Sequence, residues 1–153
     1  MMERIESFNV NHDKLMPGIY ISRQDGDIVT YDLRFKQPNG GDYLKNAVMH
    51  TIEHLMATFL RNSEYRQNII YFGPMGCRTG FYLLVRDMSG RQVIHAVKES
   101  LSFISAFDDF IPGVSRIECG NYLEHDLRGA RQECIVMSKV AENYTEWQLK
   151  YTE

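Results

Sequence analysis

Residues 29 to 36 alternate apolar and polar side chains so regularly that they fit only a β-strand with one buried face. The apolar face comprises Val29, Tyr31, Leu33 and Phe35, and the polar face comprises Thr30, Asp32, Arg34 and Lys36. Turn-forming residues precede this strand at 24–27, and a Pro-Asn-Gly-Gly sequence at 38–41 follows it. We therefore predict a β-hairpin over residues 17–37.

Apolar residues at helical spacing predict helices over residues 42–62, 90–106 and 126 to about 148. Asp42 and Asp126 are suited to cap the first and the last of these helices, because Asp accepts hydrogen bonds from first-turn amides. Further strands are predicted over residues 67–73, 79–86 and 114–122. This order has little regular βαβ alternation. It favours one α+β domain over residues 1–153, with a mainly antiparallel sheet and helices on one face.

The composition excludes several classes of protein. The chain has 153 residues, 44% of them hydrophobic and 24% charged, as in an ordinary globular domain. Its net charge is -3 and it has no basic stripe, so nucleic acid is not an expected partner. No apolar run approaches the roughly 18 residues of a membrane span, and the N-terminal residues lack an apolar signal core. We expect a cytoplasmic protein whose three cysteines stay reduced.

The stretch from His50 to His54, which reads HTIEH, carries the strongest chemical signal. Histidines at i and i+4 lie one turn apart on the same face of a helix, where both imidazoles reach one metal ion. Glu53 lies on a neighbouring stripe, where a carboxylate beside the metal serves as a general acid or base. The alternative is a surface histidine pair with a solvated glutamate, which the apolar flanking residues disfavour.

A catalytic metal usually takes three protein ligands and keeps one position open. Cys119, on the strand predicted at 114–122, is a candidate third ligand, because a thiolate with two imidazoles suits zinc or ferrous iron. A free cysteine is also commonly a buried small hydrophobe. Glu118, Glu124 and His125 compete for the same position, and spacing alone leaves the choice open.

Two further cysteines and one charged pair remain to be interpreted. Cys77 lies in a glycine-rich loop beside a guanidinium, which favours the thiolate form, so it is a candidate nucleophile or base. Its alternative is a buried loop cysteine. Asp32 and Arg34 form either a solvated ion pair or a pair that binds a polar substrate or orients a thiolate. Cys134 falls within an apolar helical pattern and is assigned to packing.

Five segments of the chain, in order, resemble the S-ribosylhomocysteine lyase (LuxS) family. They are ESFNVNH (6–12), YDLRFKQPN (31–39), HTIEHLMATFLRN (50–62), GPMGCRTGFY (73–82) and ECGNYLEHDLRGARQ (118–132). Five blocks in register are far more specific than any single motif. The resemblance runs from about Glu6 to Gln132, and the segment after Gln132 adds nothing to it.

The resemblance implies an activity, a cofactor and a partner. The family cleaves the thioether of S-ribosyl-L-homocysteine to L-homocysteine and 4,5-dihydroxy-2,3-pentanedione, the precursor of autoinducer-2. It thereby serves the activated methyl cycle and quorum sensing. The resemblance also implies a homodimer with active sites at the subunit interface, and one divalent metal per subunit. That metal is expected to be Fe2+ in the cell, with Zn2+ or Co2+ often found instead in preparations.

The resemblance also assigns roles to the residues of the central motifs. It makes His50 and His54 the histidine ligands of the metal and Cys119 the cysteine ligand. The catalytic acid–base pair becomes Glu53 and Cys77.

Other roles fall on flanking segments. Ser7 and His12 are expected to bind substrate across the dimer interface, and Arg34 is expected to support the catalytic thiolate. One departure from the family is Tyr71, which stands where many members carry an aspartate that touches the substrate.

Two rival functions share the histidine motif. HxxEH is also the signature of one class of metallopeptidases, in which Glu53 would activate a water molecule and a distant glutamate would be the third ligand. The chain is short for that class, and Cys77 would have no role in it. A non-catalytic metal protein would need four protein ligands, and His125 is available to complete such a site.

Overall fold

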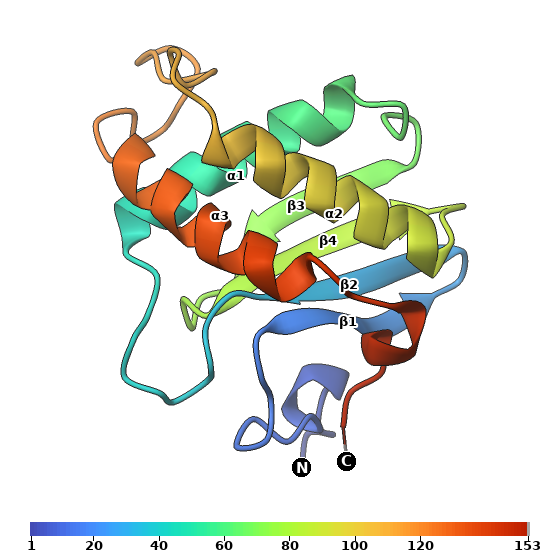
Figure 1. Ribbon diagram of the computed structural model, residues 1–153. Coiled ribbons are helices and arrows are strands. Elements are labelled where there is room, and N and C mark those ends of the chain that lie inside the picture. The colour runs from blue at the N-terminus through green and yellow to red at the C-terminus, as the bar shows by residue number, and fades with distance from the viewer. Residues whose placement is uncertain (153) are drawn as a thin grey trace.

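The computed structural model describes residues 1–152. Its four strands form one antiparallel sheet in the order β1-β2-β4-β3, and they are β1 (Gly18–Asp25), β2 (Ile28–Arg34), β3 (Ile69–Pro74) and β4 (Gly80–Arg86). Figure 1 shows the α-helices together on one face of this sheet, namely α1 (Asn46–Asn62), α2 (Gly90–Ser105) and α3 (Leu127–Ala141). The short 3-10 helices η1 (Glu6–Phe8) and η2 (Glu146–Leu149) lie near the chain ends. The predicted α+β class is confirmed.

The predicted hairpin is formed by β1 and β2. Gly26 has a φ of 61° in its turn, a conformation that costs glycine little. The alternation along β2 sorts the side chains as predicted, because Tyr31 and Leu33 pack into the core between sheet and helices. The opposite face is not solvated, since Asp32 and Arg34 are only 1% and 3% exposed. The interpretation of these two residues as a solvated ion pair is therefore wrong.

The core between the sheet and the helices holds the histidine helix in place. Ile52, Leu55 and Met56 of α1 are fully buried there, and each such side chain contributes about 1.5 to 3 kcal/mol. Cys134 of α3 lies in the same core, where burial, with a smaller effect of Glu133, raises the pKa of its thiol. Its assignment to packing is confirmed.

The start of α1 differs from the prediction. The helix begins at Asn46, after Lys45, rather than next to Asp42. The carboxylate of Asp42 instead pairs with Lys36 at 3.0 Å. The amide of Leu44 donates to the carbonyl of Arg78 at 2.9 Å, which keeps this segment out of the helix. By contrast, Asp126 caps α3 as predicted, by accepting a hydrogen bond from the amide of Gly129.

The last predicted strand and the length of the last helix are also wrong. Residues 114–122 form turns, in which the amide of Cys119 donates to the carbonyl of Ser115 at 3.0 Å, and Ile117 is 98% exposed. A strand there would need a partner strand, and the sheet offers none to this loop. The helix α3 ends at Ala141 rather than near 148, and η2 follows after a turn.

None of the helices within residues 1–152 combines the length and the apolar character needed to cross a membrane.

Candidate metal centre and active site

The helix α1 presents His50 and His54 toward one point, and backbone carbonyls orient both rings. The Nδ1 atom of His50 lies 2.8 Å from the carbonyl oxygen of Glu124, and that of His54 lies 2.8 Å from the carbonyl oxygen of Pro112. A carbonyl only accepts, so each Nδ1 carries the proton and each Nε2 keeps a free lone pair. This arrangement is typical of histidines that bind a metal through Nε2.

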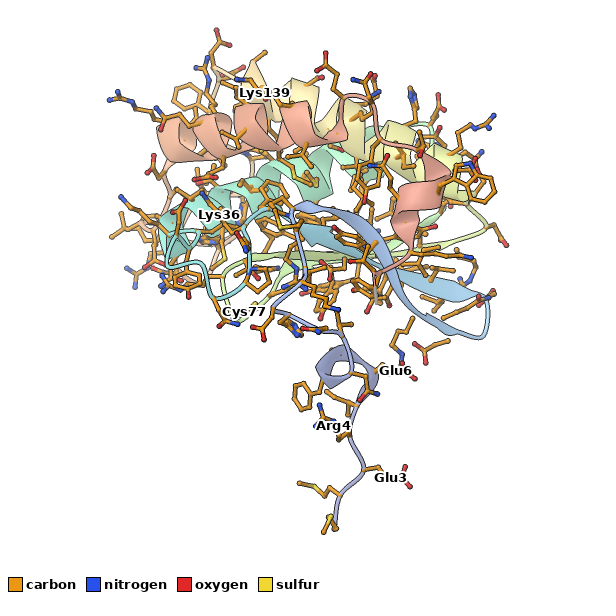
Figure 2. All side chains as sticks on the ribbon, turned by 60° about the horizontal axis from the view of Figure 1, so that its bottom comes forward. Glu3, Arg4, Glu6, Lys36, Cys77 and Lys139 are labelled. Atoms are coloured by element: carbon orange, nitrogen blue, oxygen red, sulfur yellow. The ribbon has the colours of Figure 1, made fainter. Side chains whose placement is uncertain are left out.

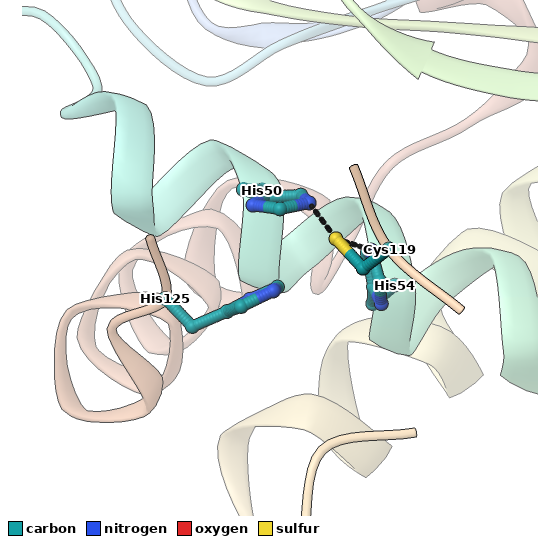
Figure 3. Close-up of side chains that lie close together, drawn as sticks. All are labelled: His50, His54, Cys119 and His125. Carbon is teal, nitrogen blue, oxygen red and sulfur yellow. Dashed lines mark hydrogen bonds between the residues drawn. The ribbon is translucent and has the colours of Figure 1, made fainter. Parts of the chain in front are cut away.

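Cys119 brings a sulfur to the same point from a distant part of the chain, as Figure 3 shows. Its Sγ lies 3.3 Å from Nε2 of His50 and 3.9 Å from Nε2 of His54. Metal–nitrogen bonds of about 2.1 Å and metal–sulfur bonds of about 2.3 Å at tetrahedral angles separate the two ligand atoms by about 3.6 Å. The spacing of these donor atoms therefore fits one divalent metal ion.

The loop before α3 is held close to His54 by a glycine. Gly113 has a φ of 74°, which strains any other residue. A Cβ atom at this position would lie 3.2 Å from Nδ1 of His54. The glycine thus leaves room for the neighbouring carbonyl of Pro112 to accept the His54 hydrogen bond.

His125 is a fourth side chain in this cluster. The ligand atoms of His50, His54, Cys119 and His125 all lie within 4.8 Å of one another. The ring of His125 stacks on that of His50 at 3.9 Å, and its Nδ1 lies 3.0 Å from the hydroxyl of Thr51. Within residues 1–152, its buried Nε2 has no hydrogen-bond partner. Burial, with a smaller electrostatic effect of the neighbouring His50 and His54, lowers the pKa of His125 to about 4, so the ring is neutral at pH 7.

The other two competitors for the metal are not part of the cluster. Glu118 is exposed, and its carboxylate accepts a hydrogen bond from the Ser115 hydroxyl at 2.6 Å. That hydrogen bond is the main reason why the pKa of Glu118 is lowered. Glu124 contributes its backbone carbonyl to His50, not its side chain.

Cys77 is an exposed thiol between β3 and β4, next to a buried arginine. The Nη1 atom of Arg34 donates to the hydroxyl of Thr79 at 2.7 Å and lies 4.0 Å from Sγ of Cys77. The Thr79 hydroxyl is itself 3.0 Å from that sulfur. Because Arg34 donates to Thr79, the hydroxyl proton is free to point at the sulfur. The guanidinium and the hydroxyl thus both present N–H or O–H groups toward the sulfur of Cys77.

The guanidinium of Arg34 is held by the carboxylate of Asp32. Nη2 and Nε of Arg34 donate to the two carboxylate oxygens at 2.6 and 3.1 Å. Burial lowers the pKa of Arg34, but hydrogen bonding to Asp32 and the charge of Asp32 outweigh it and raise the pKa overall. The guanidinium therefore stays charged although it is buried.

Three predicted residues lie apart from these contacts. Glu53 is half-buried on α1, and no hydrogen bond or ion pair with another part of residues 1–152 ties up its carboxylate. Ser7 lies on η1, and His12 follows it with Nδ1 2.8 Å from the carbonyl of Val10. Figure 2 shows this N-terminal segment extending away from the rest of the molecule.

Several side chains that build these contacts were not predicted from the sequence. Thr79 was a detectable candidate, because it follows Cys77 by two residues at the start of β4. Thr51 was also detectable, because it lies between the motif histidines on α1. The carbonyls of Pro112 and Glu124 carry no signal in the sequence, since every residue has a carbonyl.

The α+β fold gathers imidazoles and the Cys119 thiol at one point. It also exposes a separate thiol, Cys77, beside the buried Arg34. These features define a metal-binding enzyme domain. A model of the family described as S-ribosylhomocysteinase (LuxS) matches residues 5–150. The chain therefore belongs to the LuxS family. The match includes the segment after Gln132, where the motifs alone provide no resemblance.

Individual relatives cover the chain almost completely. An S-ribosylhomocysteine lyase of Clostridium acetobutylicum is 44% identical over 158 residues, which span 99% of this chain and all of the relative. An S-ribosylhomocysteine lyase of Borreliella burgdorferi is 46% identical over 98% of this chain and 99% of its own length. One of Finegoldia magna is 46% identical over 99% of this chain and 100% of its own length.

Proposed function

We propose that this chain is a metal-dependent S-ribosylhomocysteine lyase. It would convert S-ribosyl-L-homocysteine to L-homocysteine and 4,5-dihydroxy-2,3-pentanedione, the precursor of autoinducer-2. The structural observation that carries the proposal is the sulfur of Cys119, 3.3 and 3.9 Å from the Nε2 atoms of His50 and His54. Membership of the LuxS family and relatives named for this activity support it.

We infer that His50, His54 and Cys119 hold one divalent metal per subunit, Fe2+ in the cell, with Zn2+ or Co2+ able to replace it. A thiolate with two imidazoles suits these ions. When bound, the metal supplies Lewis acidity that stabilises negative charge on the sugar oxygens. Reduced Cys77 and Cys119 are needed, and a reducing compartment keeps thiols reduced. We therefore propose a cytoplasmic location.

The chemistry of the substrate defines what the protein groups must do. The carbonyl of the open-chain sugar has to move from C1 to C3, because only then is the C4 proton acidic and the C5 sulfur β to a carbonyl. Each shift removes a proton from one carbon, returns one to its neighbour and moves a proton between the two oxygens. Elimination then takes the C4 proton and breaks the C5–S bond, and homocysteine leaves. No external oxidant or reductant is consumed.

We assign the proton transfers to Cys77 and Glu53. As a thiolate, Cys77 would take protons from carbon at Sγ, with Arg34 and Thr79 beside the sulfur. Within residues 1–152 no hydrogen bond or ion pair ties up the Glu53 carboxylate, and Glu53 lies three residues after the first motif histidine. It would transfer protons between the sugar oxygens and take the C4 proton as homocysteine leaves.

We further propose a homodimer with its active sites at the subunit interface. The N-terminal segment around Glu3, Arg4 and Glu6 extends from the rest of the molecule, as expected of a segment that reaches a second copy (Figure 2). Met2, Ile5 and Phe8 of this segment expose large apolar surfaces, which a partner subunit would cover. Ser7 and His12 would then bind substrate in the site of the partner.

A thiol-release assay tests the proposed function. Purified protein loaded with Fe2+ or Co2+ should release one free thiol per S-ribosylhomocysteine consumed, and a chelator should stop the release. Glu53→Gln and Cys77→Ala should each abolish turnover and keep the bound metal. Loss of metal from either variant would contradict the assignment, because it would make that residue a ligand. Cleavage of a peptide substrate without thiol release would favour the metallopeptidase, which the family membership does not support.

A further inference from the structure

Tyr151, near the C-terminus, makes a contact that no part of the proposed mechanism uses. Its hydroxyl donates a hydrogen bond to Oδ2 of Asp32 at 2.7 Å, across 119 residues of sequence. Figure 1 shows the two ends of the chain close together, next to β1. The last residues therefore return to the sheet at the level of the buried Asp32–Arg34 pair.

Tyr151 is held in place by two residues of β1. Its ring stacks on that of Tyr20, with ring centroids 5.0 Å apart and an interplanar angle of 18°. Tyr20 pairs directly with Asp32 across the β1–β2 ladder, so the two side chains share one face of the sheet. The side chain of Ser22 also hydrogen-bonds to Tyr151, which leaves the phenol proton for the carboxylate. The hydroxyl is thus aimed at Asp32 by its surroundings.

The contact continues from Asp32 to the sulfur of Cys77. The carboxylate oxygen that accepts from Tyr151 also accepts from Nη2 of Arg34, at 2.6 Å. The opposite end of the guanidinium donates to the hydroxyl of Thr79, which lies 3.0 Å from Sγ of Cys77. A continuous series of hydrogen bonds therefore links the end of the chain to the exposed thiol.

We propose that Tyr151 is a positioning residue, which holds the guanidinium of Arg34 against Cys77 by hydrogen-bonding its counter-ion Asp32. This inference rests on the proposed role of Cys77 as the catalytic thiolate. The negative charge of Asp32 opposes the effect of Arg34 on the sulfur. A hydrogen bond from Tyr151 withdraws part of that charge, so the positive field of the guanidinium at Cys77 is stronger when the tail is docked.

The experiment compares Tyr151→Phe with a matched control, Tyr144→Phe. The first substitution removes the hydroxyl and keeps the ring that stacks on Tyr20. The control removes a hydroxyl that lies 2.7 Å from the carbonyl of Ile19, 2.9 Å from that of Gln148 and beside the Tyr20 hydroxyl, but makes no hydrogen bond to Asp32. The main measurement is the rate at which iodoacetamide alkylates Cys77, followed by mass spectrometry of the tryptic peptide 67–78. This rate does not depend on lyase activity.

The expected result is an alkylation rate at Cys77 about three- to tenfold lower in Tyr151→Phe, because a hydrogen bond to a charged group is lost. The control should react at the wild-type rate. In the lyase assay, kcat should fall by a similar factor while KM stays the same, since substrate binding is not altered.

Two results would overturn the proposal. One is a wild-type alkylation rate in Tyr151→Phe. The other is an equal decrease in both variants, which would mean that loss of any buried hydroxyl loosens this region. If wild-type protein releases no thiol from S-ribosylhomocysteine but only Tyr151→Phe slows alkylation, the positioning role stands and the proposed lyase function fails.

Discussion

Replacing Asp32 by asparagine tests whether the buried ion pair is essential to the fold around Cys77. Asp32 and Arg34 have side chains only 1% and 4% exposed. The substitution keeps the size of the side chain and removes its charge, so the guanidinium is left buried without a counter-ion. Removing one partner of a buried ion pair typically lowers the free energy of unfolding by about 3 to 5 kcal/mol.

The contacts of Arg34 indicate that the loss of unfolding free energy in Asp32→Asn lies at the lower end of this range. Arg34 keeps its hydrogen bond to the Thr79 hydroxyl at 2.7 Å, and the amide oxygen of the introduced asparagine still accepts one hydrogen bond. We therefore expect the free energy of unfolding to fall by about 3 kcal/mol. Urea unfolding, followed by circular dichroism at a fixed metal concentration, measures this change.

The matched control is Asp25→Asn, which removes the partner of Arg23 in an exposed pair whose side chains are 46% and 53% exposed. An exposed pair contributes about 0 to 1 kcal/mol, so this variant should unfold almost as the wild type does. The double variant Asp32→Asn/Arg34→Met should recover part of the lost stability, because it removes the buried charge as well. Equal stability of Asp32→Asn and Asp25→Asn would refute the argument.

Three further predictions concern the two sites. Cys119→Ser should lower metal affinity by more than the roughly 10- to 100-fold loss that is typical when a residue that only hydrogen-bonds a metal ligand is replaced. Cys77→Ser should bind Co2+ as the wild type does. The absorbance of the thiolate–cobalt bond during titration measures the Co2+ affinity of both variants. Unchanged affinity in Cys119→Ser would mean that Cys119 is not a metal ligand. Gly113→Ala should lower metal affinity about tenfold, because its Cβ would lie 3.2 Å from a ring nitrogen of His54. Gly26→Ala also has a positive φ but has nothing within 4 Å, so it should lose stability only, and a similar loss of affinity in both would contradict this reasoning. Thr79→Val should slow alkylation of Cys77 severalfold, because it removes the hydroxyl 3.0 Å from the sulfur and a hydrogen bond contributes about 1 kcal/mol. An unchanged alkylation rate would show that Thr79 does not act on the sulfur.

Local patterns in the sequence predicted much of the fold. The hairpin of β1 and β2, the strands β3 and β4 and the helix α2 all lie within a few residues of their predicted positions. The capping of α3 by Asp126 was also predictable, because a cap acts within one helical turn. The errors lie where tertiary contacts override local preference. The amide of Leu44 donates to the carbonyl of Arg78, so α1 begins later than predicted, and the segment 114–122 has no strand to pair with.

The sequence by itself determined that His50 and His54 present their rings on one side of a helix, because the geometry of an α-helix sets the spacing of i and i+4. It also determined which face of β2 carries Asp32 and Arg34, because side chains alternate along a strand. Only the tertiary structure decided that Cys119, rather than Glu118 or Glu124, meets the histidines, together with His125. Cys119 is 69 residues from His50, and the path of the chain over that distance depends on packing of the whole core.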